Sequence, residues 1–240
     1  MTPKEFLDLY REAFSEKVPI PIAFGYGGTP ACENNNVPRC IIGTIRKVAD
    51  GMPLTLHREN VRCGGGKLYT MFAPMPESVP SFVSETERYK ASGEMVVEYV
   101  RDLGISLAEK PYLNFMPLTL LKTWDGIEGI LFFATPDMLS GLAAWAFYDN
   151  NSNDAVVTRF ASGCAGIVTF AIKENREKGR SCFIAGFDPS ARPLIPQNEL
   201  TFTIPMSRFM EMTGTMRESA LFRNAFSVVR KRIAGEITGR

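Results

Sequence analysis

The sequence predicts a single α+β domain spanning residues 1–240, with a mixed β-sheet packed by helices and a helical pair at the C-terminus. Apolar runs typical of strands interleave with segments of helical spacing, but they lack the strict alternation of a doubly wound parallel sheet. Several strand-like runs are also short enough to pair antiparallel. Because no internal repeat or low-complexity linker divides the chain, one domain is favoured.

The first half of the chain is predicted to place short strands between amphipathic helices. Thr2 and Glu5 form a capping box, with Pro3 at the first helical position, which predicts that a helix begins there. Gly51 follows a second helical pattern at the position where a C-terminal glycine belongs. In order, the expected elements are this opening helix, a strand over 19–24, a helix over 39–50, a strand over 54–57 and a helix from 68.

The second half continues with a helix over 84–103 that is charged on one face. Thr135 and Pro136 then start a helix directly after an apolar strand. The chain finishes with two helical segments that Gly214 is expected to separate. Further strands are predicted over 127–133, 181–186 and 200–204, and the two last helices over 206–212 and 218–233.

The composition is that of an ordinary globular protein: 45% of the residues are hydrophobic, 22% are charged and the formal net charge is +1. A chain so close to neutral has no long-range field that attracts nucleic acid or an anionic membrane. No charged segment followed by an apolar run opens the chain, and no run of about 18 apolar residues occurs. We therefore expect a cytoplasmic protein with neither a nucleic-acid nor a membrane partner.

Five cysteines and one histidine limit the available chemistry. An odd number of cysteines in a chain without a secretory signal favours free or metal-bound thiols over a disulfide framework. A serine-histidine-aspartate triad, a multi-histidine zinc site or a cysteine-histidine dyad would have to use His57. We interpret His57 as a residue at a strand end, so these classes of site are disfavoured.

The segment from Ala155 to Ile172 carries the first candidate site. A buried strand over 155–160 precedes a tight turn at Ser162 and Gly163, which places Cys164 in the first turn of a helix. Unpaired backbone N–H groups and the helix dipole there favour a thiolate, so Cys164 is a candidate nucleophile, redox thiol or metal ligand. The alternative is a small apolar residue packed under a turn, because free cysteine is among the most buried residue types.

A glycine-rich segment, Gly64, Gly65, Gly66 and Lys67, precedes a predicted helix and has the features of an anion cradle. Its glycines allow close backbone approach, and the lysine adds positive charge. It is not a Walker A motif, because the first glycine and the magnesium-binding hydroxyl of that motif are missing. The alternative is a flexible turn that needs glycine for its backbone angles.

Three arginines, Arg159, Arg180 and Arg192, flank the last two cysteine-bearing segments. A guanidinium near a strand end can clamp a carboxylate or phosphate with two hydrogen bonds, although a solvated or ion-paired arginine is more common. The Asp188-Pro189 dipeptide predicts an ordered turn that aims Arg192 in a definite direction.

A set of cysteines, glycine turns and one apolar segment spans most of the chain. It consists of Cys40 on a helix, Cys63-Gly64-Gly65, the segment GILFFATPDMLSGL over 129–142, Ser162-Gly163-Cys164, Cys182 with Arg192, and a final Ile204-Pro205. Together these features resemble an uncharacterised prokaryotic group, the domain of unknown function family 169. The resemblance supports one domain, and it implies positions without implying a reaction. The segment over 187–190 is longer than the resemblance leads us to expect.

The first functional hypothesis is a pocket for a small anionic or redox-active ligand. It would be bordered by the Cys63–Gly66 loop, by Ser162 and Cys164, and by the segment ending at Arg192. In this hypothesis Cys164 is the reactive thiol or donor atom, the glycines supply backbone donors, and Arg192 or Arg159 neutralises the ligand.

Two alternatives remain open. Cys40, Cys63, Cys164 and Cys182 could converge on an iron–sulfur cluster or another metal ion, although the chain lacks compact Cys-x-x-Cys pairs. The protein could also be a non-enzymatic homodimer that associates through its terminal amphipathic helix. The sequence names no cofactor, substrate or reaction, and it leaves open whether the protein is an enzyme.

Overall fold

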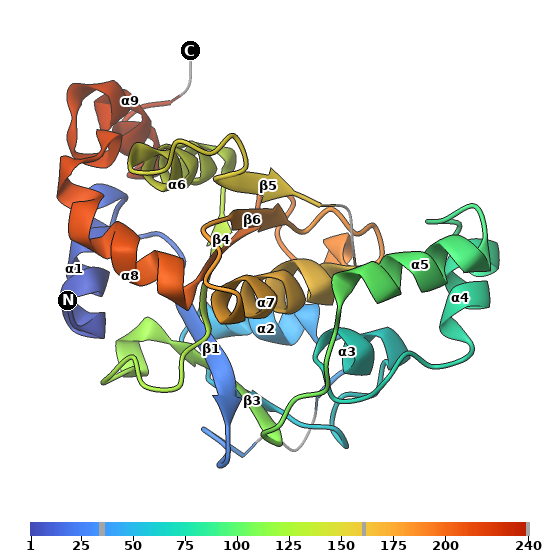
Figure 1. Cartoon of the computed structure of the whole chain (residues 1–240). Helices are drawn as coiled ribbons and strands as arrows, with labels where there is room; N and C mark the ends of the chain where they lie inside the picture. Colours follow the sequence, from blue (N-terminus) through green and yellow to red (C-terminus); the bar gives the residue numbers. More distant parts are fainter. Residues whose placement is uncertain (34–36, 160–161, 239–240) are drawn as a thin grey trace.

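The computed structural model describes residues 1–33, 37–159 and 162–238, and it confirms the predicted α+β class. Within these ranges a seven-stranded sheet carries helices on both faces (Figure 1). The strand order is β2-β3-β1-β4-β7-β6-β5, and every neighbouring pair is antiparallel except β5 and β6. The strands are β1 Ile22–Gly27, β2 Leu54–Leu56, β3 Tyr112–Pro117, β4 Gly129–Ala134, β5 Val156–Thr158, β6 Cys182–Ala185 and β7 Leu200–Pro205.

Two of these strands differ from the sequence prediction. The strand expected over 155–160 is β5, which ends at Thr158, and Phe160 lies outside the described residues. Strand β3 was not anticipated, because Asn114 and a terminal proline interrupt its apolar pattern. Its ladder partners β1 and β2 nevertheless satisfy its backbone on both sides.

The helices form two layers, one on each face of the sheet (Figure 1). The terminal layer comprises α1 Pro3–Ala13, α6 Pro136–Tyr148, α8 Met206–Thr215 and α9 Asn224–Ile233, and the central layer comprises α2 Ile42–Val48, α3 Gly64–Tyr69, α5 Gly93–Leu103 and α7 Phe170–Arg176. Successive side chains along a strand point to opposite faces of the sheet, so each strand contributes to both layers. Ile130 and Phe132 of β4 face the terminal layer, whereas Leu131 and Phe133 face the central one.

An aromatic cluster holds the terminal layer together. The ring of Phe6 on α1 lies 4.7 Å from that of Phe209 and 6.1 Å from that of Trp145. The indole Nε1 of Trp145 donates to the carbonyl oxygen of Met212 at 2.9 Å. The predicted capping box is confirmed, since Thr2 N donates to Glu5 Oε2 at 2.7 Å and Glu5 N donates to Thr2 Oγ1 at 3.3 Å.

The C-terminal helical pair is present, but its predicted break is wrong. Helix α8 continues through Gly214, and the chain turns later, where Ser219 caps a short 3₁₀ turn. Leu221 and Phe226 are buried in the protein's own core, while Val228 is 60% exposed. Association through this helix therefore stays a prediction. No helix in the described part of the chain is long and apolar enough to cross a membrane.

The central layer corrects two further predictions. The segment Gly64–Gly66 is not a loop: it forms the first turn of α3, where a Cβ on Gly66 would lie 3.1 Å from Val61 Cγ1. The helix expected over 84–103 is divided into a π-helical turn, Phe82–Thr86, and α5. It breaks because Arg88 has a φ of 58°, which is incompatible with a continuous right-handed helix. A short helix, α4 Val79–Ser81, precedes the π turn.

The Cys164 helix begins as predicted. Helical backbone starts at Gly163, passes through a π-helical segment, Ala165–Thr169, and continues as α7. The segment packs directly on the sheet, because a Cβ on Gly166 would lie 2.4 Å from the Cβ of Ala185 on β6. Glycine thus allows the helix start to approach the sheet closely, which fixes the position of Cys164.

Candidate functional site

A cavity of about 170 Å³ lies in the central layer, between the start of the Cys164 helix and the segment that carries α4 and α5. Figure 1 shows α3, α4 and α5 grouped at one side of the molecule, next to the start of the helix that continues as α7. Five separate parts of the chain line the cavity: residues 40–42, 63–69, 79–99, 162–164 and 188–191. Cys40, Cys63 and Cys164 all contribute to its wall, and we call it the thiol cavity.

The three thiols of the cavity lie close enough to influence one another's ionisation. Burial raises the pKa of Cys164 strongly, and the neighbouring Cys40 and Cys63 raise it further. Burial also raises the pKa of Cys40. The sequence predicted a thiolate at Cys164 from its place in a helix, but Cys164 is only 8% exposed, and desolvation outweighs the helix terminus. At neutral pH Cys164 is a neutral thiol.

The carboxylate of Asp188 occupies the start of the Cys164 helix. Its Oδ2 accepts a hydrogen bond from Gly163 N at 3.1 Å, and its Oδ1 accepts from Ser190 N at 2.9 Å and from Ser190 Oγ at 2.7 Å. Ser162 Oγ accepts from Ala165 N at 3.4 Å. The positive end of the helix is therefore already matched by a protein anion. Sequence reasoning noticed the Asp-Pro turn but missed this capping role.

Glu87 and Tyr99 face the same cavity with polar groups that nothing in the described structure satisfies. The Glu87 carboxyl has no hydrogen-bond or ion-pair partner among the described residues, and burial, together with the charge of Asp188, raises its pKa. The hydroxyl of Tyr99 is buried and has no partner in the same part of the chain. Sequence reasoning missed both residues. The helix predicted over 84–103 places Glu87 on its charged, solvated face, but the break at Arg88 turns Glu87 away from that face.

Several predicted ligand-binding residues do not line the cavity. Gly65, Gly66 and Ser162 do, but Gly64 and Lys67 lie outside its wall. The guanidinium of Arg159 sits over the rings of Phe170 and Phe183, 5.4 Å and 5.7 Å from their centroids.

Arg192 is ordered, as its Asp-Pro turn predicted, but it points into its own loop. It donates to the carbonyl oxygens of Glu199 at 2.6 Å, Gln197 at 2.9 Å and Pro196 at 3.3 Å. These bonds hold the loop over 186–199 in shape. The expectation that Arg192 borders the pocket is therefore wrong.

The four-cysteine metal site is also wrong. Cys182 belongs to the terminal layer, on the opposite face of the sheet from the thiol cavity, and its Sγ lies 3.9 Å from Met212 Sδ. Burial raises its pKa to about 12. Across residues 1–33, 37–159 and 162–238, no three histidine, cysteine or acidic side chains are grouped to hold a metal ion. The sheet keeps Cys182 away from the other thiols.

Comparison with known proteins identifies the family. The model of domain of unknown function 169 (DUF169), described as uncharacterised ArCR, matches residues 14–214 of the chain. This chain belongs to the DUF169 family. The matched span includes every part of the chain that lines the thiol cavity. No curated protein and no solved structure matches the chain.

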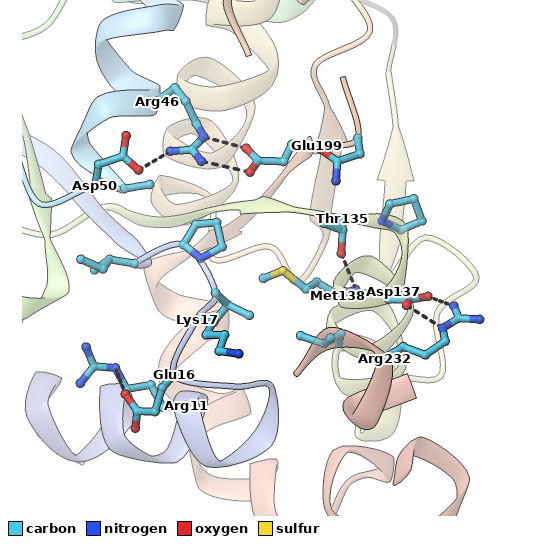
Figure 2. A pocket seen from close by; sticks show the side chains of 17 residues that line it. Arg11, Glu16, Lys17, Arg46, Asp50, Thr135, Asp137, Met138, Glu199 and Arg232 are labelled. Atoms are coloured by element: carbon cyan, nitrogen blue, oxygen red, sulfur yellow. Dashed lines mark hydrogen bonds and ion pairs between the residues drawn. The ribbon is translucent and has the colours of Figure 1, made fainter. Parts of the chain in front are cut away.

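A second, larger pocket of the DUF169 chain lies where α1, α6, α9 and the start of β7 meet (Figure 2). Its cations are mostly held by the protein's own carboxylates. Arg46 donates from Nε to Glu199 at 2.6 Å and from Nη1 to Asp50 at 2.9 Å, and Arg232 pairs with Asp137. Because these cations are paired within the protein, the pocket has little unpaired charge for a ligand to bind.

Thiol reactivity should separate the five cysteines of this DUF169 protein. At pH 8 we expect iodoacetamide to modify the half-exposed Cys32, Cys40 and Cys63 at least about tenfold faster than Cys164 and Cys182, because burial and a raised pKa reduce both access and thiolate. Peptide mass spectrometry at timed intervals measures each rate. In urea the five rates should converge, and rapid native modification of Cys164 would contradict a buried neutral thiol.

Proposed function

We propose that this DUF169 protein binds a small, predominantly apolar molecule in the thiol cavity. The observation that carries the proposal is the convergence of five distant parts of the chain on one enclosed space that contains polar groups without partners. Apolar and aromatic side chains form most of the wall, and a few polar groups converge on the interior. This is the usual character of a small-molecule site.

The size of the cavity limits the ligand. A cavity of about 150 Å³ lined by apolar side chains holds one benzene molecule, and the thiol cavity has about 170 Å³. A single six-membered ring with one short substituent is therefore the expected scale. Cys164, a neutral thiol, contributes polarisable surface to such a ring rather than a nucleophile.

The charge of the wall does not favour the anionic ligand that the sequence suggested. Glu87 and Asp188 bring two carboxylates to the cavity, and Lys90 brings one ammonium. Arg159 and Arg192, which were expected to neutralise an anion, act elsewhere. A neutral or positively charged molecule fits this wall better than a negatively charged one.

Benzyl alcohol is a suitable probe, because it combines one ring with one short polar arm. We expect calorimetry to detect its binding to the wild-type protein and a loss of at least about tenfold in affinity, or about 1.4 kcal/mol, for Gly65→Leu. Gly65 lies on α3 in the cavity wall, and a Cβ there would meet only Tyr69 and Cys63, at 3.9 Å and 4.0 Å. The leucine side chain can therefore enter the cavity without a clash at its base.

Gly214→Leu is the matched control. Gly214 is also helical, on α8 in the other layer, and nothing lies within 4 Å of its Cβ position. Its affinity for benzyl alcohol should equal that of the wild type. Equal binding by Gly65→Leu, or no binding by any form, would rule out the thiol cavity as the site.

A further inference from the structure

We infer that the molecule bound in the thiol cavity carries an ammonium group, which Glu87 and the ring and hydroxyl of Tyr99 receive. This inference rests on the proposed function, since it names the class of ligand for the same cavity. It assigns a recognition role to the Glu87 carboxyl and the Tyr99 hydroxyl, which have no hydrogen-bond partner in the described structure, and to the Tyr99 ring.

The first support is the distribution of negative charge. Asp188 lies in the cavity wall and accepts hydrogen bonds from Gly163 and Ser190. Glu87 has an open carboxyl, whose pKa is raised by burial and by the charge of Asp188. Two like charges in a desolvated wall repel each other, and a bound cation between them relieves that repulsion.

The second support comes from the aromatic side chains of the wall. Tyr69, Phe82, Tyr89 and Tyr99 all line the cavity. The ammonium of Lys90 already lies 5.0 Å from the centroid of the Tyr99 ring, so this ring accepts a cation in the protein itself. Aromatic rings that surround a cavity next to a carboxylate are a recurring way to bind organic ammonium ions.

The third support is hydrogen-bonding capacity. An ammonium has three donors and no acceptor, so it needs acceptors around it. The Glu87 carboxylate supplies two oxygens, and the buried hydroxyl of Tyr99 supplies a third. A neutral hydrocarbon would leave the buried hydroxyl of Tyr99 without a hydrogen-bond partner, which is unfavourable.

Two cations of the protein itself act on Tyr99. Lys90 stacks on Tyr99 at the edge of the cavity, and Arg159 lies near enough to lower the pKa of Tyr99, which burial raises to about 12. Lys90 therefore competes with a ligand for the ring. Removing its charge with Lys90→Met should tighten the binding of an ammonium ligand and leave that of a neutral one unchanged.

Benzylamine and benzyl alcohol form the decisive pair, because they differ mainly in charge at neutral pH. Calorimetry at pH 7.5 should show benzylamine binding to the wild type at least about tenfold more tightly than benzyl alcohol. Glu87→Gln and Tyr99→Phe should each reduce that ratio.

Each outcome of this experiment bears on one of the two proposals. Benzyl alcohol binding as tightly as benzylamine, or benzoate binding most tightly, would overturn the ammonium inference and leave the apolar site in place. Absence of binding by all three probes would overturn the proposed function as well. A preference for benzylamine that survives in both Glu87→Gln and Tyr99→Phe would overturn the roles assigned to these residues.

Discussion

Replacing Asp149 with alanine is expected to lower the free energy of unfolding by about 3 kcal/mol, because it leaves a buried guanidinium without its main counter-charge. The side chain of Arg208 has no exposed surface. Its Nη2 donates to Asp149 and, at 3.1 Å, to the carbonyl oxygen of Ala146, and its Nη1 donates to Glu211 at 2.9 Å. Urea unfolding of the variant and the wild type measures the loss.

The same ion pair makes stability depend on pH. Burial raises the pKa of Asp149, but the hydrogen bonds and charge of Arg208 outweigh it and hold the pKa below its usual value. A carboxyl with a lowered pKa stabilises the fold above its unfolded pKa, and that contribution is lost as the pH falls through the folded pKa. As the pH falls below about 4, the free energy of unfolding of the wild type should therefore decrease. Asp149→Ala lacks this carboxyl, so its free energy of unfolding should not show that decrease.

A double variant supplies the control for this prediction. Arg208→Met combined with Asp149→Ala removes both charges and retains an apolar chain of similar length, so it should cost clearly less than Asp149→Ala alone. A loss below about 1 kcal/mol for the single variant would show that Glu211 compensates the guanidinium without Asp149. A double variant as unstable as the single one would contradict the charge argument.

Gly166→Leu is expected to destabilise the protein by at least about 3 kcal/mol, because the added side chain has no space between the Cys164 helix and the sheet. A Cβ at this position would lie 2.4 Å from the Cβ of Ala185, and neither atom can rotate away. The helix start would have to move off β6, and it would carry Cys164 with it. Thermal unfolding measures the loss, and the alkylation rate of Cys164 should rise in the folded variant.

Gly214→Leu again provides the comparison for this substitution. It places the same side chain on a helix where nothing lies within 4 Å of the Cβ, so stability should stay the same or rise by up to about 1 kcal/mol. Equal stability of the two variants would mean that the close approach of the Cys164 helix to the sheet is unimportant. If Gly166→Leu is destabilised but the alkylation rate of Cys164 is unchanged, the helix start has not moved off β6.

The elements that sequence reasoning located well are those with strong local signals. The capping box at Thr2, the Thr135-Pro136 helix start and the helix start near Cys164 each depend on residues within a few positions of one another. Such signals act through backbone geometry and capping, which need no knowledge of the rest of the chain. The α+β class followed in the same way, from the spacing of apolar residues in each segment.

The elements that sequence reasoning located poorly depend on parts of the chain that are distant in sequence. Strand β3 needs β1 and β2 beside it, and the break at Arg88 depends on how α5 packs. Gly64–Gly66 has the composition of a loop but forms the first turn of α3, where Val61 leaves little space for a Cβ on Gly66. Tertiary packing overrides intrinsic preference in each case.

By itself, the sequence therefore determined the fold class, the helix starts at Pro3 and Pro136, and the set of candidate thiols. Tertiary structure alone decided which thiols meet. Cys182 and Phe183 are adjacent on β6, and because successive strand residues face opposite sides, Phe183 joins the central layer while Cys182 joins the terminal one. It also decided the ionisation of Cys164, because a helix terminus favours a thiolate locally, whereas desolvation depends on everything packed over it.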